Sequence, residues 1–296
     1  MSPADLLHFE KARPMLVGLA YRLLGSRADA EDAVQDTFLK WQAADRQTIE
    51  APAAWLTTTC TRRCLDLLSN AHRARVDYVG AWLPEPIPTP AVSDTEGGTL
   101  LADSLSTAFL LMLERLSPRE RAAYLLHEIF DTSYAEIAAM LGIKEPACRK
   151  LVSRARGNLK ITEARHAPPR ERQQALLEAF RLAITEGATS QLAALLSAEI
   201  RLSADGGGKV PTIPEPLHGQ ADVLAFLTNR LHDYWADYQW LEADINGLRG
   251  IVLQQRGSVT AAVTFGYDPD GGVTDIFIVR NPDKLALLEP LTPATS

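Results

Sequence analysis

Residues 116–159 of the chain read LSPRERAAYLLHEIFDTSYAEIAAMLGIKEPACRKLVSRARGNL. The stretch opens with a serine N-cap, a first-turn proline and a capping-box glutamate, which are Ser117, Pro118 and Glu120. This start pattern predicts a helix over 118–128, and that helix opens a small helical unit.

Two more helices are expected within the same stretch. One is predicted over residues 134–141 and stops at Gly142, since glycine tolerates the left-handed backbone of a helix end. After the turn, Pro146 can open another helix that runs to about Leu159. A helix, a short glycine turn and a second helix loaded with Lys and Arg are typical of a helix-turn-helix.

The charge of the chain is distributed unevenly. Its 296 residues include 30 Lys and Arg against 37 Asp and Glu, and this net charge of −7 argues at first against nucleic acid. However, residues 144–165 hold seven cations and two anions, whereas residues 170–296 hold 10 cations and 16 anions. Clustered cations neutralise phosphates, and arginine is the commonest reader of guanine. The cations that we expect to contact DNA are Lys144, Arg149, Lys150, Arg154 and Arg156.

The N-terminal part is predicted to be entirely helical. Ser26 caps a helix whose apolar residues form one stripe. Beside that stripe runs an acidic face with one exposed leucine, which suits a basic helical partner rather than DNA. This acidic face consists of Asp29, Asp32, Gln35, Asp36 and Leu39.

A further helix is expected from about Ala53 to Arg75. Its inward line includes Leu56 and Cys60, and its other side is rich in hydroxyl, amide and guanidinium groups. Such a surface suits the backbone of single-stranded nucleic acid, although an ordinary polar helix face is the competing interpretation. The residues of this face are Thr58, Thr61, Arg62, Arg63, Asn70 and Arg73.

The spacing of apolar residues changes in the C-terminal part of the chain, from a helical period to alternation. The proline-rich stretch after Trp82 excludes a helix or a central strand there, so it marks a boundary. Beyond residue 170 the pattern predicts an α+β domain with a curved antiparallel sheet. We expect helices at 170–187, 189–196 and 220–233, and strands at 199–203, 251–256, 258–267 and 273–280.

Composition also limits the class of protein. No apolar run approaches a bilayer span, and the N-terminus lacks the pattern of a signal peptide, so we expect a cytoplasmic protein. The three cysteines, Cys60, Cys64 and Cys148, form no CxxC pair and no even disulfide framework. We therefore expect reduced thiols, no metal site, no cofactor and no catalytic residue.

Five stretches carry a resemblance to a known family. Residues 20–41 resemble region 2 of the extracytoplasmic-function sigma factors of bacterial RNA polymerase, and residues 116–156 resemble their region 4. The stretches 82–86, 205–209 and 281–285 are similar to signatures of the subgroup with a fused SnoaL-like domain. The resemblance implies two all-α domains, the second with a helix-turn-helix, followed by an α+β SnoaL-like cone.

The resemblance also implies a division of labour along the chain. The expected parts are region 2 at 1–79, a proline-rich linker at 80–103, region 4 at 104–163 and the SnoaL-like domain at 170–296. Region 2 would bind the core polymerase and the −10 element, and region 4 the −35 element. The implied function is recruitment of core polymerase to specific promoters, under control in cis by the last domain.

The resemblance assigns roles to the faces described above. The acidic face matches the family's surface for the β′ clamp helices. The region from about Asp45 to Arg75 matches the part that reads and holds the melted −10 element, and the helix over 146–159 matches the −35 recognition helix. The three signatures imply interdomain regulation by Trp82, Leu83, Pro84, Glu85, Pro86, Asp205, Gly206, Gly207, Gly208, Lys209, Asn281, Pro282, Asp283, Lys284 and Leu285.

Two other functions stay open at this point. The chain could be a SnoaL-like cyclase or isomerase tethered to DNA-binding helices, or a ligand-sensing regulator that acts without polymerase. The expected partners of the sigma factor are core polymerase and promoter DNA, with room for an unknown small ligand in the last domain. Neither a membrane partner nor oligomerisation of the free protein is expected.

Overall fold

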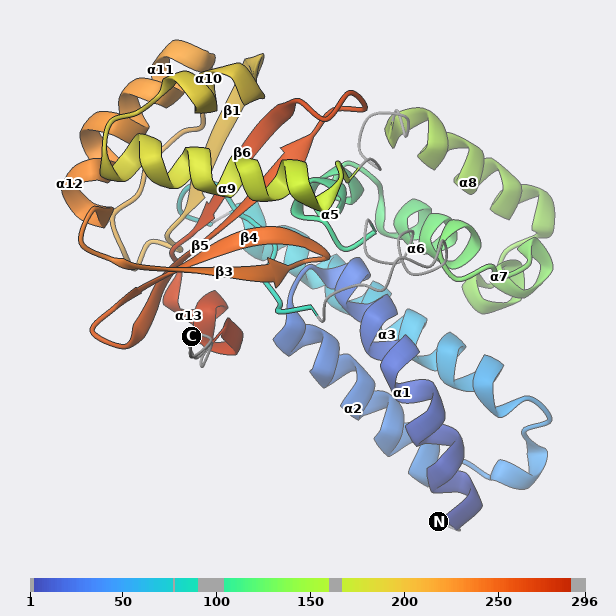
Figure 1. Ribbon diagram of the computed structural model, residues 1–296. Coiled ribbons are helices and arrows are strands. Elements are labelled where there is room, and N and C mark those ends of the chain that lie inside the picture. Colours follow the sequence, from blue (N-terminus) through green and yellow to red (C-terminus); the bar gives the residue numbers. More distant parts are fainter. Residues whose placement is uncertain (1–2, 77, 90–103, 160–166, 289–296) are drawn as a thin grey trace. The chain divides into compact units, whose positions relative to one another are not determined.

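The computed structural model describes two compact units (Figure 1). Described residues are 3–76, 78–89, 104–159 and 167–288, and the side chains of 70–76 are not among them. Unit 1 comprises Met1–Asp77 and Met112–Lys160, and unit 2 comprises Tyr78–Leu111 and Ile161–Ser296.

Unit 1 is entirely helical in its described part. Its helices are α1 (Pro3–Leu24), α2 (Arg27–Ala43), the short 3₁₀ helix η1 (Arg46–Thr48), α3 (Pro52–Val76), α6 (Pro118–Glu128), α7 (Tyr134–Leu141) and α8 (Glu145–Leu159). Large side chains from α1, α2 and α3 fill one core, among them the fully buried Leu16, Trp41 and Leu56. The buried Arg121 of α6 donates to the carbonyl of Leu23 at the end of α1, so both parts of unit 1 share one interior.

Local caps explain where the helices of unit 1 begin and end. The Ser26 hydroxyl accepts from the Asp29 amide, and Ser117 forms a complete capping box with Glu120. Ser133 forms a second box with Glu136 ahead of α7, and α7 ends at Gly142 with φ of 64°. The predicted helix-turn-helix is therefore confirmed as a structure.

Unit 2 is an α+β domain built on one six-stranded sheet. Its elements from residue 170 onward are α9 (Arg170–Thr185), α10 (Ser190–Leu195), β1 (Leu196–Asp205), β2 (Leu217–His218), α11 (Gln220–Ala225), the π-helix η2 (Phe226–Leu231), α12 (His232–Trp235), β3 (Gln239–Ile245), β4 (Leu248–Gln255), β5 (Ser258–Tyr267), β6 (Val273–Val279), α13 (Pro282–Leu285) and the 3₁₀ helix η3 (Ala286–Leu288). The strand order is β2-β1-β6-β5-β4-β3.

The expectation of an antiparallel sheet was wrong at one pair. β1 runs parallel to β6, with Leu202 opposite Ile276, while the other neighbours are antiparallel. The chain between β1 and β6 carries the helices α11 and α12 and four further strands, a connection long enough to return in parallel. The sheet is therefore mixed, and the expected α+β class is confirmed.

The two faces of the sheet are covered by different elements. Helices α9 to α12 pack on one face, where Phe180, Trp235 and Phe265 belong to the core. On the other face Leu83 of the proline-rich stretch, Leu285 of α13, and Ala108 and Leu111 pack together. The linker thus contributes core residues to unit 2.

Helix α5 (Thr107–Leu113) lies where the chain passes from unit 2 to unit 1. Its first five residues belong to unit 2, and the hydroxyls of Thr107 and Thr264 of β5 lie 2.9 Å apart. Region 4 was expected to begin at residue 104, so its first helical turn lies in the other unit. No described helix combines the length and the apolar character needed to cross a membrane.

Candidate nucleic-acid interface

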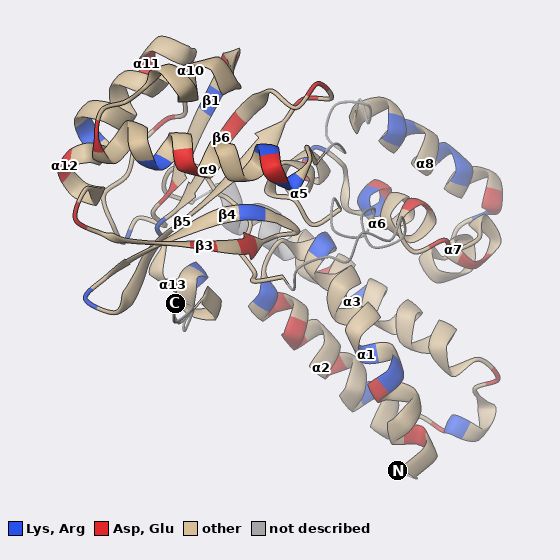
Figure 2. Ribbon diagram, viewed as in Figure 1, with Lys and Arg blue, Asp and Glu red and all other residues tan. Residues whose placement is uncertain are grey.

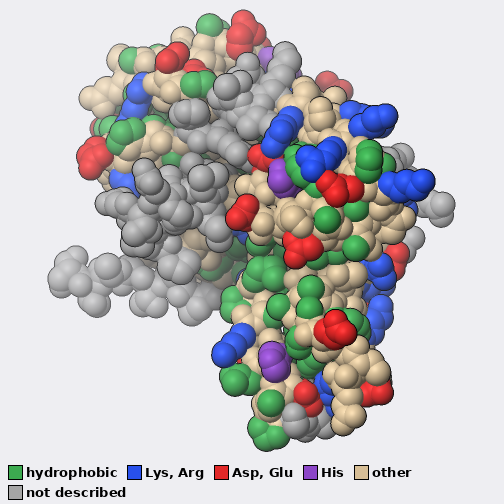
Figure 3. Space-filling view, turned by 90° about the vertical axis from the view of Figure 1, so that its right-hand side faces the viewer, with side chains coloured by type: hydrophobic (Ala, Val, Ile, Leu, Met, Phe, Trp, Pro, Cys, Tyr) green, Lys and Arg blue, Asp and Glu red, His purple; other side chains and the backbone are tan. Residues whose placement is uncertain are grey.

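Helix α8 presents the expected cations to solvent. Cys148, Val152 and Ala155 face inward and are fully buried, which fixes the opposite side of the helix as the exposed one. Figure 2 shows α8 with several cationic bands and one acidic band near α7, and Figure 3 shows Lys and Arg side chains gathered on the face turned to the viewer. All five expected residues are exposed, namely Lys144, Arg149, Lys150, Arg154 and Arg156.

The arginines of α8 differ in their partners. Arg149 pairs with Glu145 one turn earlier, and Arg156 pairs with Glu128 of α6. The hydrogen bond to Glu128 raises the pKa of the Arg156 guanidinium above its ordinary value. Lys150 and Arg154 have no ion-pair partner among the described residues, so both are available to an external anion. Arg156 is partly committed to holding α8 against α6.

The expected −10 face of α3 is only partly accessible. Thr61 was expected on this face but is fully buried, since the inward stripe of α3 is wide enough to include it beside Cys60 and Cys64. The Thr58 hydroxyl donates to the carbonyl of Ala54 one turn earlier. The side chains of Asn70 and Arg73, two further expected residues, lie outside the described part of the chain.

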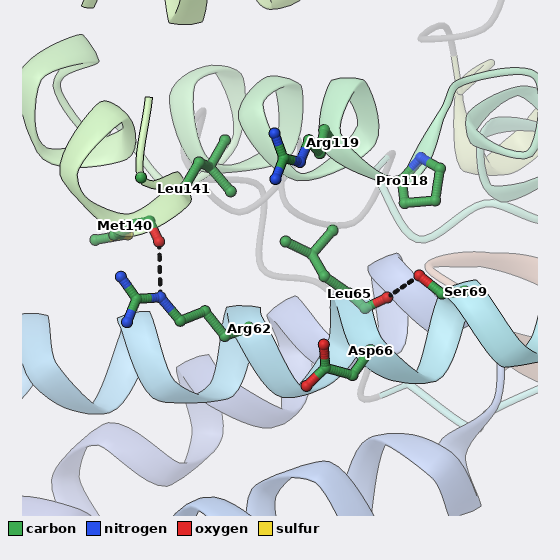
Figure 4. A pocket seen from close by; sticks show the side chains of 9 residues that line it. Arg62, Leu65, Asp66, Ser69, Pro118, Arg119, Met140 and Leu141 are labelled. Atoms are coloured by element: carbon green, nitrogen blue, oxygen red, sulfur yellow. Dashed lines mark hydrogen bonds between the residues drawn. The ribbon is translucent and has the colours of Figure 1, made fainter. Parts of the chain in front are cut away.

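Arg62 is exposed but already has partners within unit 1. Its Nε donates to the carbonyl of Met140 over 2.9 Å, and Nη2 to that of Ala139 over 3.4 Å, at the C-terminal end of α7. A groove of about 520 Å³ runs beside this contact, with Arg119 of α6 on its far wall (Figure 4). A helix C-terminus carries partial negative charge, so it attracts a guanidinium much as a phosphate would.

Two expected faces meet at one ion pair. Asp36 of α2 lies 2.7 Å from Arg63 of α3, so an expected polymerase contact and an expected −10 contact neutralise each other. Asp29, Asp32, Gln35 and Leu39 remain exposed on α2, and Leu39 shows 52% of its surface to solvent. The acidic face therefore keeps an apolar anchor with charges around it.

A second cluster of expected residues lies in unit 2, around the fully buried carboxylate of Asp205. The carboxylate accepts hydrogen bonds from the hydroxyl of Tyr78, the backbone amides of Leu83 and Gly207, and Nζ of Lys284. These bonds are between 2.6 and 3.0 Å long. The three signature stretches, far apart in sequence, thus meet at one side chain.

Lys284 completes this cluster. Its Nζ donates to the carbonyl of Leu83 over 2.6 Å and lies 4.7 Å from the ring centroid of Trp82. The Tyr78 ring lies at 4.9 Å, and burial together with the hydrogen bond to Asp205 raises the pKa of the Tyr78 hydroxyl. The linker is therefore held at both its backbone and its aromatic ring.

The remaining signature residues surround the cluster. The Asn281 side chain donates to the Tyr78 hydroxyl, and Lys209 pairs with Asp283 at the surface. Gly207 has φ of 60°, and a Cβ there would lie 2.3 Å from the Asn281 amide, so only glycine fits. Of the other positions, Pro84, Glu85, Pro86, Gly206 and Leu285 are buried, whereas Gly208 and Pro282 are exposed.

Three residues with clear structural roles were not predicted from the sequence. Tyr78 stands outside any signature, and only its position beside the linker could have marked it. Ser133 and Glu136 form a capping box whose spacing is readable in the sequence. The pKa of Glu136 is lowered by its hydrogen bonds to Ser133, which agrees with a carboxylate held at a helix start.

Two carboxylates in the described part of unit 2 that could serve as acid–base groups are bound in ion pairs. Asp275 pairs with Arg201 and Asp244 with Arg170, so both carboxylates have structural partners. The Tyr267 hydroxyl is buried, and burial raises its pKa. Within the described ranges, no group of three or more His, Cys, Asp or Glu is arranged to hold a metal ion.

Comparison with known proteins agrees with this geometry. Residues 8–74 match the Sigma-70 region 2 family and residues 106–159 match Sigma-70, region 4. The chain is 35% identical to the ECF RNA polymerase sigma factor SigJ of Mycobacterium tuberculosis, over 95% of this chain and 93% of that protein. It is 34% identical to the probable ECF RNA polymerase sigma factor SigI of the same species, over 74% and 83%.

The architecture is shared as well. The crystal structure of the M. tuberculosis extracytoplasmic function sigma factor SigJ covers 97% of this chain and all of its own, with a TM-score of 0.74 at 31% identity. Both helical regions and the fused α+β domain fall within that match. The chain therefore belongs to the extracytoplasmic-function sigma factors of bacterial RNA polymerase, in the subgroup with a SnoaL-like C-terminal domain, and its function is transcription initiation.

Proposed function

We propose that the C-terminal domain of this sigma factor regulates promoter recognition in cis, through the cluster around Asp205. The observation that carries the proposal is the meeting of the three signature stretches at one buried carboxylate. In this proposal α2 contacts the β′ clamp helices, α3 holds the −10 element and α8 reads the −35 element.

The linker explains how a C-terminal domain can act on two promoter-binding regions. Residues 80–103 connect region 2 to region 4 in sequence, so their path limits how far the two regions can separate. Asp205 and Lys284 bind both backbone groups of Leu83, and the Leu83 side chain is buried in the sheet's core. Releasing Leu83 from these contacts would therefore lengthen the connection between the two regions and change the reach of α8 relative to α3.

Charge and exposure support the DNA contacts. Lys150 and Arg154 point to solvent, and each neutralised phosphate releases counterions on binding. On α2, Asp29 and Asp32 are exposed beside Leu39, which suits a basic helical partner. Thr61 is excluded from the −10 contact by its burial, and Arg62 must leave the end of α7 before it can bind DNA.

In this proposal the SnoaL-like domain is a regulator and not an enzyme. The paired carboxylates and the aromatic packing of Phe180 against Trp240 and Phe265 leave its core committed to stability. The free sigma factor is proposed to be monomeric, with core polymerase and promoter DNA as its partners.

Run-off transcription with core polymerase tests the regulatory role. Tyr78→Phe and Asp205→Asn weaken the grip on the linker, and both should change promoter-dependent transcript yield several-fold relative to the full-length wild-type chain. Because Asp205→Asn alters a buried charge, thermal unfolding must accompany it. Tyr78→Phe changes no charge and removes only the two hydrogen bonds of the hydroxyl, the one donated to Asp205 and the one accepted from Asn281. Wild-type yields from both variants, in protein that keeps its fold, would show that the cluster has no regulatory role.

A further inference from the structure

Tyr134, the first residue of α7, contacts planar side chains of both neighbouring helices. Its ring centroid lies 4.0 Å from that of His127 of α6, at an interplanar angle of 31°. The guanidinium carbon of Arg149 of α8 lies over the same ring, 4.4 Å from its centroid. The imidazole is fixed in turn, since its Nδ1 lies 3.1 Å from the carbonyl of Thr132.

Arg149 has a second restraint on its own helix. Its Nε and Nη2 both donate to Oε1 of Glu145, over 3.1 and 2.6 Å. Nevertheless, 60% of the Arg149 side chain is exposed. The guanidinium is therefore held in place by a ring and a carboxylate while its outer edge faces solvent.

The chemistry of that outer edge is specific. A guanidinium has five N–H donors, and Glu145 takes one from Nε and one from Nη2. One hydrogen of Nη1 and the remaining hydrogen of Nη2 point in parallel and form a fork, which matches the O6 and N7 acceptors of guanine in the major groove. A phosphate contact is less demanding of orientation, since a lysine ammonium also binds phosphate, as a point charge.

The geometry points to Tyr134 and Glu145 as positioning residues that orient Arg149 to read a guanine of the −35 element. Lys150 and Arg154, which lack ion-pair partners among the described residues, are the phosphate contacts beside it. This inference rests on the proposed placement of α8 on the −35 element. It adds which cation reads a base and what holds that cation in place.

The contacts of Arg149 with Tyr134 and Glu145 order its guanidinium before DNA binds, which lowers the entropy cost of the base contact. A free arginine loses rotamer entropy when it is ordered on DNA, whereas Arg149 has already been ordered by Tyr134 and Glu145. Removing the ring should therefore weaken specific binding while leaving non-specific binding unchanged. A merely structural role of Tyr134 would weaken both.

The test uses holoenzyme assembled from the full chain and core polymerase, and a promoter selected by that holoenzyme from a random library. Each guanine of the −35 element is replaced in turn by 7-deazaguanine, which lacks the N7 acceptor. In wild type, one replacement should cost about tenfold in affinity. Tyr134→Ala should lose about three- to tenfold on the unmodified promoter and be insensitive to that replacement.

A double-mutant cycle separates positioning from folding. Tyr134→Ala should add nothing to Arg149→Ala, and Tyr134→Trp, which keeps a ring for the guanidinium, should restore affinity. The salt dependence should be unchanged in Tyr134→Ala but shallower in Lys150→Ala. Tyr234→Ala, at an exposed tyrosine of unit 2, is the matched control.

Four outcomes decide between the alternatives. Additive losses from Tyr134→Ala and Arg149→Ala, or equal losses on promoter and random DNA, would overturn the positioning role. Sensitivity of Arg149→Ala to 7-deazaguanine as strong as in wild type would overturn the guanine contact. Wild-type promoter affinity in both Arg149→Ala and Lys150→Ala would instead refute the placement of α8 on the −35 element.

Discussion

The cluster around Asp205 and the cations of α8 are built from similar side chains but lie in opposite environments. Asp205 is fully buried and Lys284 is partly buried, with 14% of its side chain exposed, and their charges are satisfied by each other and by the linker backbone. On α8 the charges of Lys150 and Arg154 face water. Buried charge of this kind fixes one internal arrangement, whereas exposed charge is available to a partner.

The comparison predicts its largest effect for Lys284→Met. The substitution leaves the Asp205 carboxylate buried without its cation, which should cost about 3–5 kcal/mol of unfolding free energy in unit 2. Urea unfolding of wild type and Lys284→Met measures this loss of free energy. The double variant with Asp205→Asn should recover much of the loss, and a cost under about 1 kcal/mol for Lys284→Met would show that the pair is not structural.

An effect of similar size is expected at the exposed acidic face, but on binding instead of stability. Reversing Asp29 and Asp32 to Lys places cations against a basic partner and should abolish co-purification with core polymerase. Unfolding of the variant should match wild type, since both side chains are exposed. Normal recovery of core polymerase would show that the face is only solvated. Asp36 is unsuitable for this test because it pairs with Arg63.

The cations of α8 should give an intermediate effect. Arg154→Ala should weaken holoenzyme binding to all DNA sequences by about tenfold and lower the salt slope by roughly one. Its unfolding free energy should stay within about 0.5 kcal/mol of wild type, as is usual for exposed positions. Arg156→Ala is the contrast, because this arginine pairs with Glu128 and should affect DNA less. A larger DNA effect from Arg156 than from Arg154 would reverse the assignment.

The smallest effect concerns pH and the capping box of α7. Ser133 lowers the pKa of Glu136 in the folded state, so the contribution of this carboxylate is present above its unfolded pKa and is lost as pH falls through the lowered folded value. Stability should therefore decline slightly as the pH falls below the ordinary pKa of a glutamate, and less so in Glu136→Gln. Thermal unfolding of wild type and Glu136→Gln across that pH range measures the effect. A difference in stability between the two proteins that does not change with pH would contradict the prediction.

Local signals explain how much of unit 1 could be predicted. Ser117 and Glu120 lie within one helical turn, and Gly142 ends α7 by its own backbone preference, so these boundaries are written in the sequence. Thr61 shows what a local sequence pattern cannot predict. Helical spacing placed it beside Arg62 on the polar side, but burial depends on how α3 packs against α1 and α2, which no local pattern records.

Non-local pairing explains what could not be predicted in unit 2. The parallel alignment of β1 with β6 joins residues more than 70 positions apart, and neither strand alone indicates its partner. Tyr78 enters the Asp205 cluster through a hydrogen bond to a residue 127 positions away. The signatures predicted that these three stretches act together, but not that a single carboxylate connects them.

Run-off transcription tests the central claim most directly, namely that exposed cations of α8 direct this sigma factor to its promoters. Full-length wild type and the double variant Arg149→Ala, Arg154→Ala are compared with the same core polymerase on the same promoter. The double variant should retain core binding and normal unfolding while promoter-dependent transcript falls at least tenfold. Transcript equal to that of wild type would show that promoter recognition does not depend on this helix.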